Sequence, residues 1–440
     1  MSSTGVWPPE VDGRGARRMA SLKAMLRTLA ESGERHDPLV FGGRAQIIDK
    51  VMRIARHLPP RGPKGNTILI HGAPGVGKTA LVCETARRME REGAATIIQP
   101  EIPAPGRIQA IYAALATALA NAPPDLGRST ARTGTVLSVR PGGVGGDHLT
   151  SRSVAPPSLE DPESIADLRA GQAWRNERAI VFIDEIQNIA PDTQAEESRF
   201  VRALHVQERI PVLLVCSGLS NSEDALARAG LSRLGTENCI ALGPLTSEEA
   251  LDCARATLDL VRRRGISGSD RRMRRWAKRI AASSDGWPRH LQNYLTATWE
   301  TLAAQDAPDL DTADLDATIR RGDARREDYY IGRISRSGLP IGVVGALHER
   351  IALGEALDPY QAIDVIDEAV ARLPAGMRRS IGARFADGND RLENLLRAGI
   401  VSLDRRNRCI SPIPTLHQFI LSEYRKGAGS SAAKVRPSTS

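Results

Sequence analysis

The chain of 440 residues is long enough for two or three domains, and its 41% hydrophobic and 25% charged residues are ordinary for a soluble globular protein. Its formal net charge of +8 is compatible with a nucleic acid or another acidic partner but does not identify one. No apolar run is long enough to span a membrane, and no secretory signal is evident. Five scattered cysteines argue against a zinc site or a disulfide framework. We therefore expect a cytoplasmic protein without membrane contact.

The first segment, residues 1–37, is polar and then basic. It contains a helix-like stretch, Ala16–Leu29, with four cationic side chains. Chain ends are often left outside the folded core, so we interpret this segment as a tail or a linker helix.

Residues 38–245 alternate short apolar runs with helical stretches, which predicts an α/β domain built on a parallel sheet. Apolar runs bounded by polar residues are typical of buried parallel strands. The candidate strands are Thr67–His71, Ala95–Gln99, Ala179–Asp184, Val212–Ser217 and Cys239–Leu242. A segment rich in Pro, Gly, Ser and Thr interrupts the pattern at residues 122–171. We expect an exposed insertion there, in which Thr135–Val139 and Val144–His148 could pair as a short hairpin.

The first candidate strand leads into a glycine-rich loop that matches G-x-x-x-x-G-K-[ST], and a helix follows. The glycines let backbone N–H groups surround phosphate oxygens, and the helix N-terminus adds partial positive charge. We expect Lys78 to bind the β- and γ-phosphates of ATP and Thr79 to offer a hydroxyl to Mg²⁺. The predicted nucleotide-binding residues of the loop are Gly72, Ala73, Pro74, Gly75, Val76, Gly77, Lys78, Thr79 and Ala80.

Two acids end the strand that begins at Ala179. Asp184 is placed to hold the hydrated Mg²⁺, and Glu185 to act as the general base that polarises the attacking water. Paired acids after a strand are often only the start of a helix. Downstream of a complete phosphate loop they predict turnover of ATP as well as its binding.

The remaining chain is helical. Residues 246–322 open with a capping sequence at Thr246 and form a predicted helical lid. Residues 323–425 combine helices near Ile341–Ile351, Tyr360–Arg372 and Arg391–Ala398 with β-like stretches Ile400–Leu403 and Cys409–Ser411 around a basic turn, which predicts a winged-helix-like domain. We expect the Ser-, Ala- and Gly-rich residues 426–440 to be disordered.

The phosphate loop, the Asp184-Glu185 strand end and the entry sequence Val40-Phe41-Gly42-Gly43-Arg44 resemble the AAA+ ATPases of the origin-recognition and replication-initiator group. The related STAND signalling ATPases share that entry. The resemblance covers roughly residues 39–302 and implies a parallel-sheet P-loop NTPase (AAA+) core with a helical lid. It also implies that Phe41, Gly42 and Arg44 contact the base side of ATP, unless this segment is only a surface turn.

The resemblance extends to less specific elements. Ser217, with Asn221 as the alternate, stands where sensor 1 faces the γ-phosphate, although initiators usually have asparagine directly at the strand end. Arg233 resembles the arginine finger that enters a neighbouring subunit's site, which implies a homo-oligomer. Arg289, after Pro288, resembles sensor 2 of the lid. A turn residue, a surface salt bridge and an ordinary helix start are the respective alternatives.

The sequence leaves two outputs open. A wing-like basic turn, Asp404–Arg408, and nine cations between Arg262 and Arg279 favour a DNA-transaction ATPase acting on duplex DNA. The nine cations could equally be the solvated face of two helices. The alternative is a STAND-like signalling ATPase whose C-terminal domain binds a protein partner that the sequence does not name.

Overall fold

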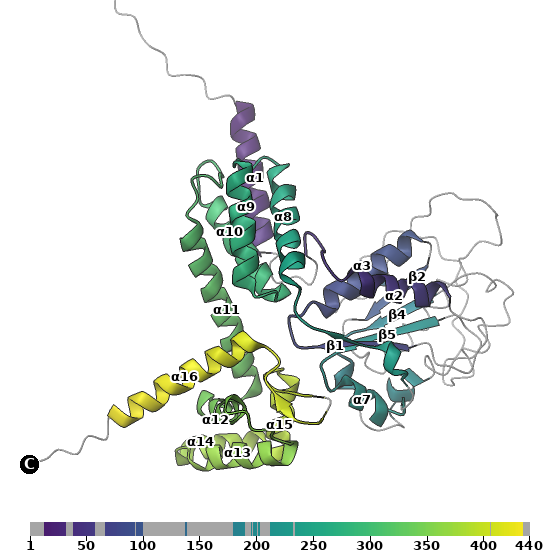
Figure 1. Cartoon of the computed structure of the whole chain (residues 1–440), viewed down its shortest axis with the longest axis vertical. Coiled ribbons are helices and arrows are strands. Elements are labelled where there is room, and N and C mark those ends of the chain that lie inside the picture. Colours follow the sequence, from purple (N-terminus) through teal and green to yellow (C-terminus); the bar gives the residue numbers. More distant parts are fainter. Residues whose placement is uncertain are drawn as a thin grey trace, which may run out of the picture. The chain divides into compact units, whose positions relative to one another are not determined.

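In the computed structural model the chain folds into two compact units, each assembled from two separate stretches (Figure 1). The first unit combines Met1–Gly43 with Pro244–Tyr329, and the second combines Arg44–Gly243 with Tyr330–Ser440. The structure describes residues 13–31, 38–57, 67–92, 94–99, 137–138, 179–189, 195, 197–199, 201–202, 212–231, 234–404 and 406–433.

The second unit contains a six-stranded parallel sheet, as the alternating sequence pattern predicts. Its strands are β1 (Thr67–Gly72), β2 (Ala95–Gln99), β3 (Leu137–Ser138), β4 (Ala179–Ile183), β5 (Val212–Gly218) and β6 (Cys239–Leu242), in the order β3-β2-β4-β5-β1-β6. The described side chains of β1, β4 and β5 are almost all buried, which explains their apolar sequences. Strand β1 lies between β5 and β6 and leads into the helix α3 (Lys78–Arg91), which packs against the sheet and against α2 (Ala45–Arg56).

The hairpin expected in the insertion stays a prediction, but the structure gives its first piece a further pairing. Leu137 and Ser138 pair in parallel with Ile97 and Ile98 of β2, so this short piece extends the main sheet at its edge. The backbone of an edge strand offers unpaired N–H and C=O groups to any adjacent extended segment, and this pairing satisfies them. The proposed partner, Val144–His148, lies outside the described residues.

The first unit is a bundle of helices: α8 (Ser247–Arg262), α9 (Asp270–Ser284), α10 (Pro288–Ala303) and the first part of α11 (Leu315–Ser337). The helix α8 begins with the predicted capping box, in which Thr246 and Glu249 satisfy each other's backbone N–H groups. The side chains of Trp276, Tyr294 and Trp299 are fully or almost fully buried at the centre of the bundle. The expected domain boundary at 322–323 falls inside the continuous helix α11.

The N-terminal helix is part of this bundle, which corrects its interpretation as a tail or linker. Helix α1 (Gly13–Glu31) packs along α10, and Leu22 and Leu26 are buried in the same apolar cluster as Trp276 and Trp299 (Figure 1). The basic residues of the segment masked this role, since a helix with four cations can still bury one apolar stripe.

The C-terminal part of the second unit has the predicted order of helices and a two-stranded ribbon. It comprises α12 (Ile341–Ala352), α13 (Pro359–Ala371), α14 (Ala375–Arg384), α15 (Gly388–Arg397), β7 (Ser402–Leu403), β8 (Cys409–Ile410) and α16 (Pro414–Ala433). Strands β7 and β8 pair antiparallel around the basic turn.

The expected disordered tail also needs correction, because α16 continues past Lys426 to Ala433. Extending an existing helix costs less free energy than nucleating one, so a segment rich in Ala and Ser can prolong a helix that packing has already formed. None of the helices within the described ranges is long and apolar enough to cross a membrane.

Candidate functional site

The phosphate loop connects β1 to α3 in the predicted strand–loop–helix arrangement. Gly75 and Gly77 have φ angles of 75° and 93°, in the left-handed region where glycine carries no steric cost. Gly72 is needed for close packing, because a Cβ there would lie 2.6 Å from the carbonyl oxygen of Leu242 in β6. The loop can therefore turn its backbone N–H groups inward at the start of a 14-residue helix.

Lys78, the first residue of α3, is a buried cation inside this loop. Its exposed fraction is 6%, and its Nζ donates hydrogen bonds to the carbonyl oxygens of Gly72 (2.9 Å) and Ala73 (3.2 Å). Burial lowers the pKa of Lys78, Glu185 and Asp184 partly oppose that effect, and Arg333 adds to it. An anion bound in the loop would stabilise the charged form of Lys78 and so oppose the effect of burial on its pKa.

Three oxygen-bearing side chains meet beside the loop. Asp184, at the end of β4, accepts hydrogen bonds from Thr79 Oγ1 (2.5 Å) and Ser217 Oγ (2.7 Å), and also from the backbone N–H of Glu185 (3.0 Å). Asp184 and Ser217 are buried, with exposed fractions of 6% and 0%. The sequence-predicted metal ligands, 105 residues apart, are thus brought together. A hydroxyl and a carboxylate are hard oxygen ligands that fit Mg²⁺.

Glu185 follows Asp184 with a left-handed backbone (φ 51°) and accepts a hydrogen bond from the side-chain amide of Gln187. Gln187 Oε1 in turn accepts from the backbone N–H of Leu219 (3.0 Å), in the loop after β5. A Cβ on Gly218 would overlap that oxygen. Gln187 therefore links the candidate general base to the candidate sensor strand, a role that the sequence analysis missed because it depends on two separate strands.

The entry segment divides between the two units. Arg44 donates from Nη2 to the carbonyl oxygens of Val76 (3.0 Å) and Gly243 (2.6 Å), so it braces the back of the phosphate loop. Gly42 belongs to the first unit, where a Cβ would overlap Cys253 Sγ of α8. Phe41 is half-buried in the same unit. The contacts described for Arg44 and Gly42 are structural, and a base-side role for Phe41, Gly42 and Arg44 stays a prediction.

The sensor candidates differ in their surroundings. Ser217 contacts Asp184, whereas Asn221, at the start of α7 (Ser222–Arg228), has a buried Oδ1 without a hydrogen-bond partner among the described residues. Arg289 lies in the first turn of α10, and its guanidinium stacks over the ring of Tyr329 at 5.6 Å. Arg233 lies outside the described residues, so its arginine-finger role stays a prediction.

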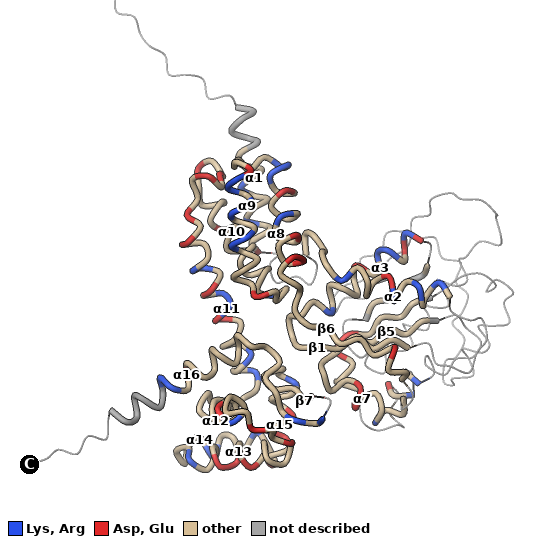
Figure 2. Tube along the Cα trace, viewed as in Figure 1, with Lys and Arg blue, Asp and Glu red and all other residues tan. Residues whose placement is uncertain are grey.

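Lys and Arg residues are concentrated along α9 (Figure 2). With 3.6 residues per turn, the cations at positions 271, 274, 275, 278 and 279 share one side of the helix, while Trp276 and Ile280 face the core. In the part of the chain that the structure describes, these exposed cations form no ion pair: Arg271, Arg274, Arg275, Lys278 and Arg279. We call these five residues the α9 basic face.

The wing-like turn carries less available charge than its sequence indicates. Asp404 accepts hydrogen bonds from Arg408 Nε (2.9 Å) and Nη2 (2.6 Å), and this contact is the main reason that the pKa of Asp404 falls to about 2. At the end of the preceding helix, Arg397 pairs with Glu393 at 2.9 Å. Arg408 and Arg397 are thus compensated within the chain, and Arg405 lies outside the described residues.

Comparison with known proteins supports the domain and the fold. Residues 40–215 match the family model described as an AAA ATPase domain. No curated protein matches the chain significantly. The Walker-type ATPase PABY2304 of Pyrococcus abyssi is similar in structure, with a TM-score of 0.50 and 12% identity over 86% of this chain and 96% of its own.

Two further solved structures have lower TM-scores. Cdc6p of Pyrobaculum aerophilum has a TM-score of 0.40 and 16% identity, over 90% of this chain and 97% of its own. The Orc1 protein of Aeropyrum pernix, solved in complex with DNA, has a TM-score of 0.39 and 18% identity, over 89% and 95%. At these identities a likeness concerns the fold alone. The family match and the geometry of the loop agree that residues 40–215 of this chain form an AAA ATPase domain.

Proposed function

We propose that this protein binds ATP with Mg²⁺ in the phosphate loop and hydrolyses it. The observation that carries the proposal is the meeting of Thr79, Asp184 and Ser217 beside the buried Lys78. Thr79 and Asp184 would hold Mg²⁺, which neutralises charge on the β- and γ-phosphates. Lys78 would bind those phosphates as a cation.

Glu185 would accept a proton from the attacking water. Its link to Gln187 keeps the carboxylate beside the loop after β5, and Ser217 orients Asp184 from the neighbouring strand. A general base needs only to lie within hydrogen-bond reach of the water in the bound complex. Arg233, as an arginine finger in a homo-oligomer, and Arg289, as a lid sensor, would add positive charge near the γ-phosphate.

Two substitutions test the ATPase proposal. Lys78→Ala should abolish ATP binding in a titration with a fluorescent ATP analogue. Retained tight binding would contradict the assignment of the phosphate loop as the ATP-binding site. Glu185→Gln should bind ATP but leave it unhydrolysed, because an amide cannot take the proton. Turnover of that variant at the wild-type rate would require a different base. Glu223→Gln, a first-turn acid of α7, is the matched control that removes one carboxylate.

We propose that the ATPase acts in a DNA transaction, and the α9 basic face supports this output. Five exposed cations on one side of a helix can neutralise phosphates along a duplex. Arg274→Gln with Arg275→Gln should reduce the salt dependence of DNA binding by about two in the slope of log K against log salt. Arg378→Gln with Arg379→Gln removes the same charge from exposed positions of α14 and should leave the slope unchanged.

A STAND-like signalling switch is the second candidate, in which the C-terminal part binds a protein. The internal ion pairs of Arg408 and Arg397 favour it, since they reduce the charge that these two side chains offer to phosphates. The ATPase rate with and without duplex DNA, at low and moderate salt, separates the two. Stimulation that fades as salt rises supports the DNA transaction, and a rate indifferent to DNA supports the signalling switch.

A further inference from the structure

The turn that follows α15 is seated on the phosphate loop. Gly399 has a φ angle of 63° and ends the helix with backbone hydrogen bonds from Gly399 to Leu396 and from Ile400 to Leu395, each 3.0 Å long. A Cβ on Gly399 would overlap the ring of Pro74, the residue that precedes Gly75 in the loop. The backbone of the C-terminal part therefore approaches the loop more closely than any residue with a side chain would permit.

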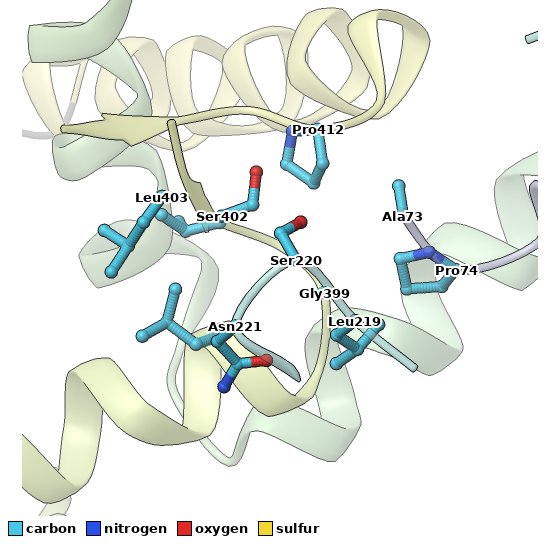
Figure 3. A pocket seen from close by; sticks show the side chains of 11 residues that line it. Ala73, Pro74, Leu219, Ser220, Asn221, Gly399, Ser402, Leu403 and Pro412 are labelled. Atoms are coloured by element: carbon cyan, nitrogen blue, oxygen red, sulfur yellow. The ribbon is translucent and has the colours of Figure 1, made fainter. Parts of the chain in front are cut away.

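The turn after α15 lies beside two segments, the phosphate loop and the loop after β5 (Figure 3). Ala73 and Pro74 of the phosphate loop, and Ser220 and Asn221 after β5, line one small pocket together with the turn after α15. In the loop after β5, the backbone N–H of Leu219 also donates a hydrogen bond to Gln187, the partner of Glu185. The turn therefore touches two of the segments that would respond to a γ-phosphate.

Arg333 of α11 holds this turn in place. Its Nε donates to the carbonyl oxygen of Ala398 at 2.8 Å, and its Nη2 donates to the same oxygen. The position that a Cβ on Gly399 would take lies 3.0 Å from Arg333 Nη2 and 2.1 Å from Pro74 Cγ. The guanidinium of Arg333 is thus next to the contact between the turn and the loop.

We propose that Arg333 is a phosphate-sensing residue, which exchanges the Ala398 carbonyl for the terminal phosphate of ATP and so ties the position of the turn after α15 to the bound nucleotide. This inference rests on the proposed ATP binding. A guanidinium hydrogen bond to phosphate is charge-assisted and about twice as strong as one to a neutral carbonyl, and it can be bidentate. The exchange removes both hydrogen bonds that hold Ala398 and frees Gly399 to leave Pro74.

The test compares the affinities of the full chain for ATP and ADP by calorimetry, in the Glu185→Gln background so that ATP survives. Adding Arg333→Gln should weaken ATP binding by about tenfold to a hundredfold and change ADP binding much less. Arg333→Lys keeps the charge and should restore part of the preference for ATP. Arg336→Gln, an exposed arginine one turn further along α11, should change neither affinity.

Equal loss of ATP and ADP binding in Arg333→Gln, or no loss, would overturn the inference. If the parent chain binds neither nucleotide, the proposed function itself fails, which is a different result. Hydrogen exchange provides a readout that does not depend on the folding of an Arg333 variant. In the Glu185→Gln protein, the amides of Gly399 and Ile400 should exchange faster with ATP than with ADP, and equal exchange rates would also overturn the inference.

Discussion

Leu26 provides a direct test of where the N-terminal helix belongs. It has no exposed surface and lies in the apolar cluster of the helical bundle, against residues of the lid segment that are more than 200 positions away in sequence. Leu26→Ala removes buried carbon atoms and leaves a cavity, which costs about 2.7–5 kcal/mol at fully buried leucines. For a unit on the order of 100 residues, each kcal/mol lowers Tm by about 4–8 °C, so we expect a drop of at least about 10 °C.

The assay is differential scanning calorimetry of the full chain, because the two units need not unfold together. Arg27→Ala is the matched control, since Arg27 is the next residue on α1 and its side chain is exposed. Surface substitutions of this kind usually change stability by no more than about 0.5 kcal/mol. If Leu26→Ala and Arg27→Ala unfold at the same temperature, α1 does not contribute to the core and the linker interpretation returns.

Ser217→Ala should lower ATPase turnover about tenfold and destabilise the protein, because Asp184 loses a buried hydrogen bond. Asn221→Ala should have neither effect. Steady-state kinetics and thermal unfolding compare the two variants, and the opposite pattern would make Asn221 the sensor. Binding of ATP at alkaline pH should be accompanied by proton uptake, because burial lowers the pKa of Lys78 in the free protein and a bound phosphate favours its charged form. Calorimetry in buffers of different ionisation enthalpy measures that uptake, and its absence would contradict the assignment of Lys78. Burial and the neighbouring His417 lower the pKa of His348 to about 3 in the folded chain, so the unfolded chain binds more protons between about pH 6.5 and 3. The free energy of unfolding should therefore decrease as pH is lowered from about 6.5 to 3, by up to about 1.4 kcal/mol per pH unit for this group. Urea unfolding of His348→Leu should depend less on pH than that of the wild type.

The chemistry of the loop could be predicted from the sequence because it depends on residue types at local spacings. Gly75, Gly77 and Lys78 lie within four positions, and the backbone that joins β1 to α3 sets their geometry. The pairing of Thr79 with Asp184 was also predictable, since parallel strands end at one edge of a sheet and bring their following residues together.

Other features depend on contacts between distant segments, for which one sequence contains no local signal. The piece at Leu137 pairs with β2, and the boundary expected at 322–323 lies within α11. In both cases the local pattern was interpreted correctly as extended or helical, but its partner or its extent was decided by neighbouring backbone. Tertiary packing overrides local preference wherever the local signal is weak.

The sequence by itself determined the AAA ATPase domain, the place of its phosphate loop and the acids that follow β4, because each is a short pattern whose chemistry tolerates few alternatives. Only the tertiary structure decided that α1 belongs to the helical bundle and that Arg333 and Gly399 adjoin Pro74. The physical reason is that burial and hydrogen bonding between segments are properties of the folded chain. A glycine at a helix end looks the same in sequence whether solvent or a phosphate loop faces it.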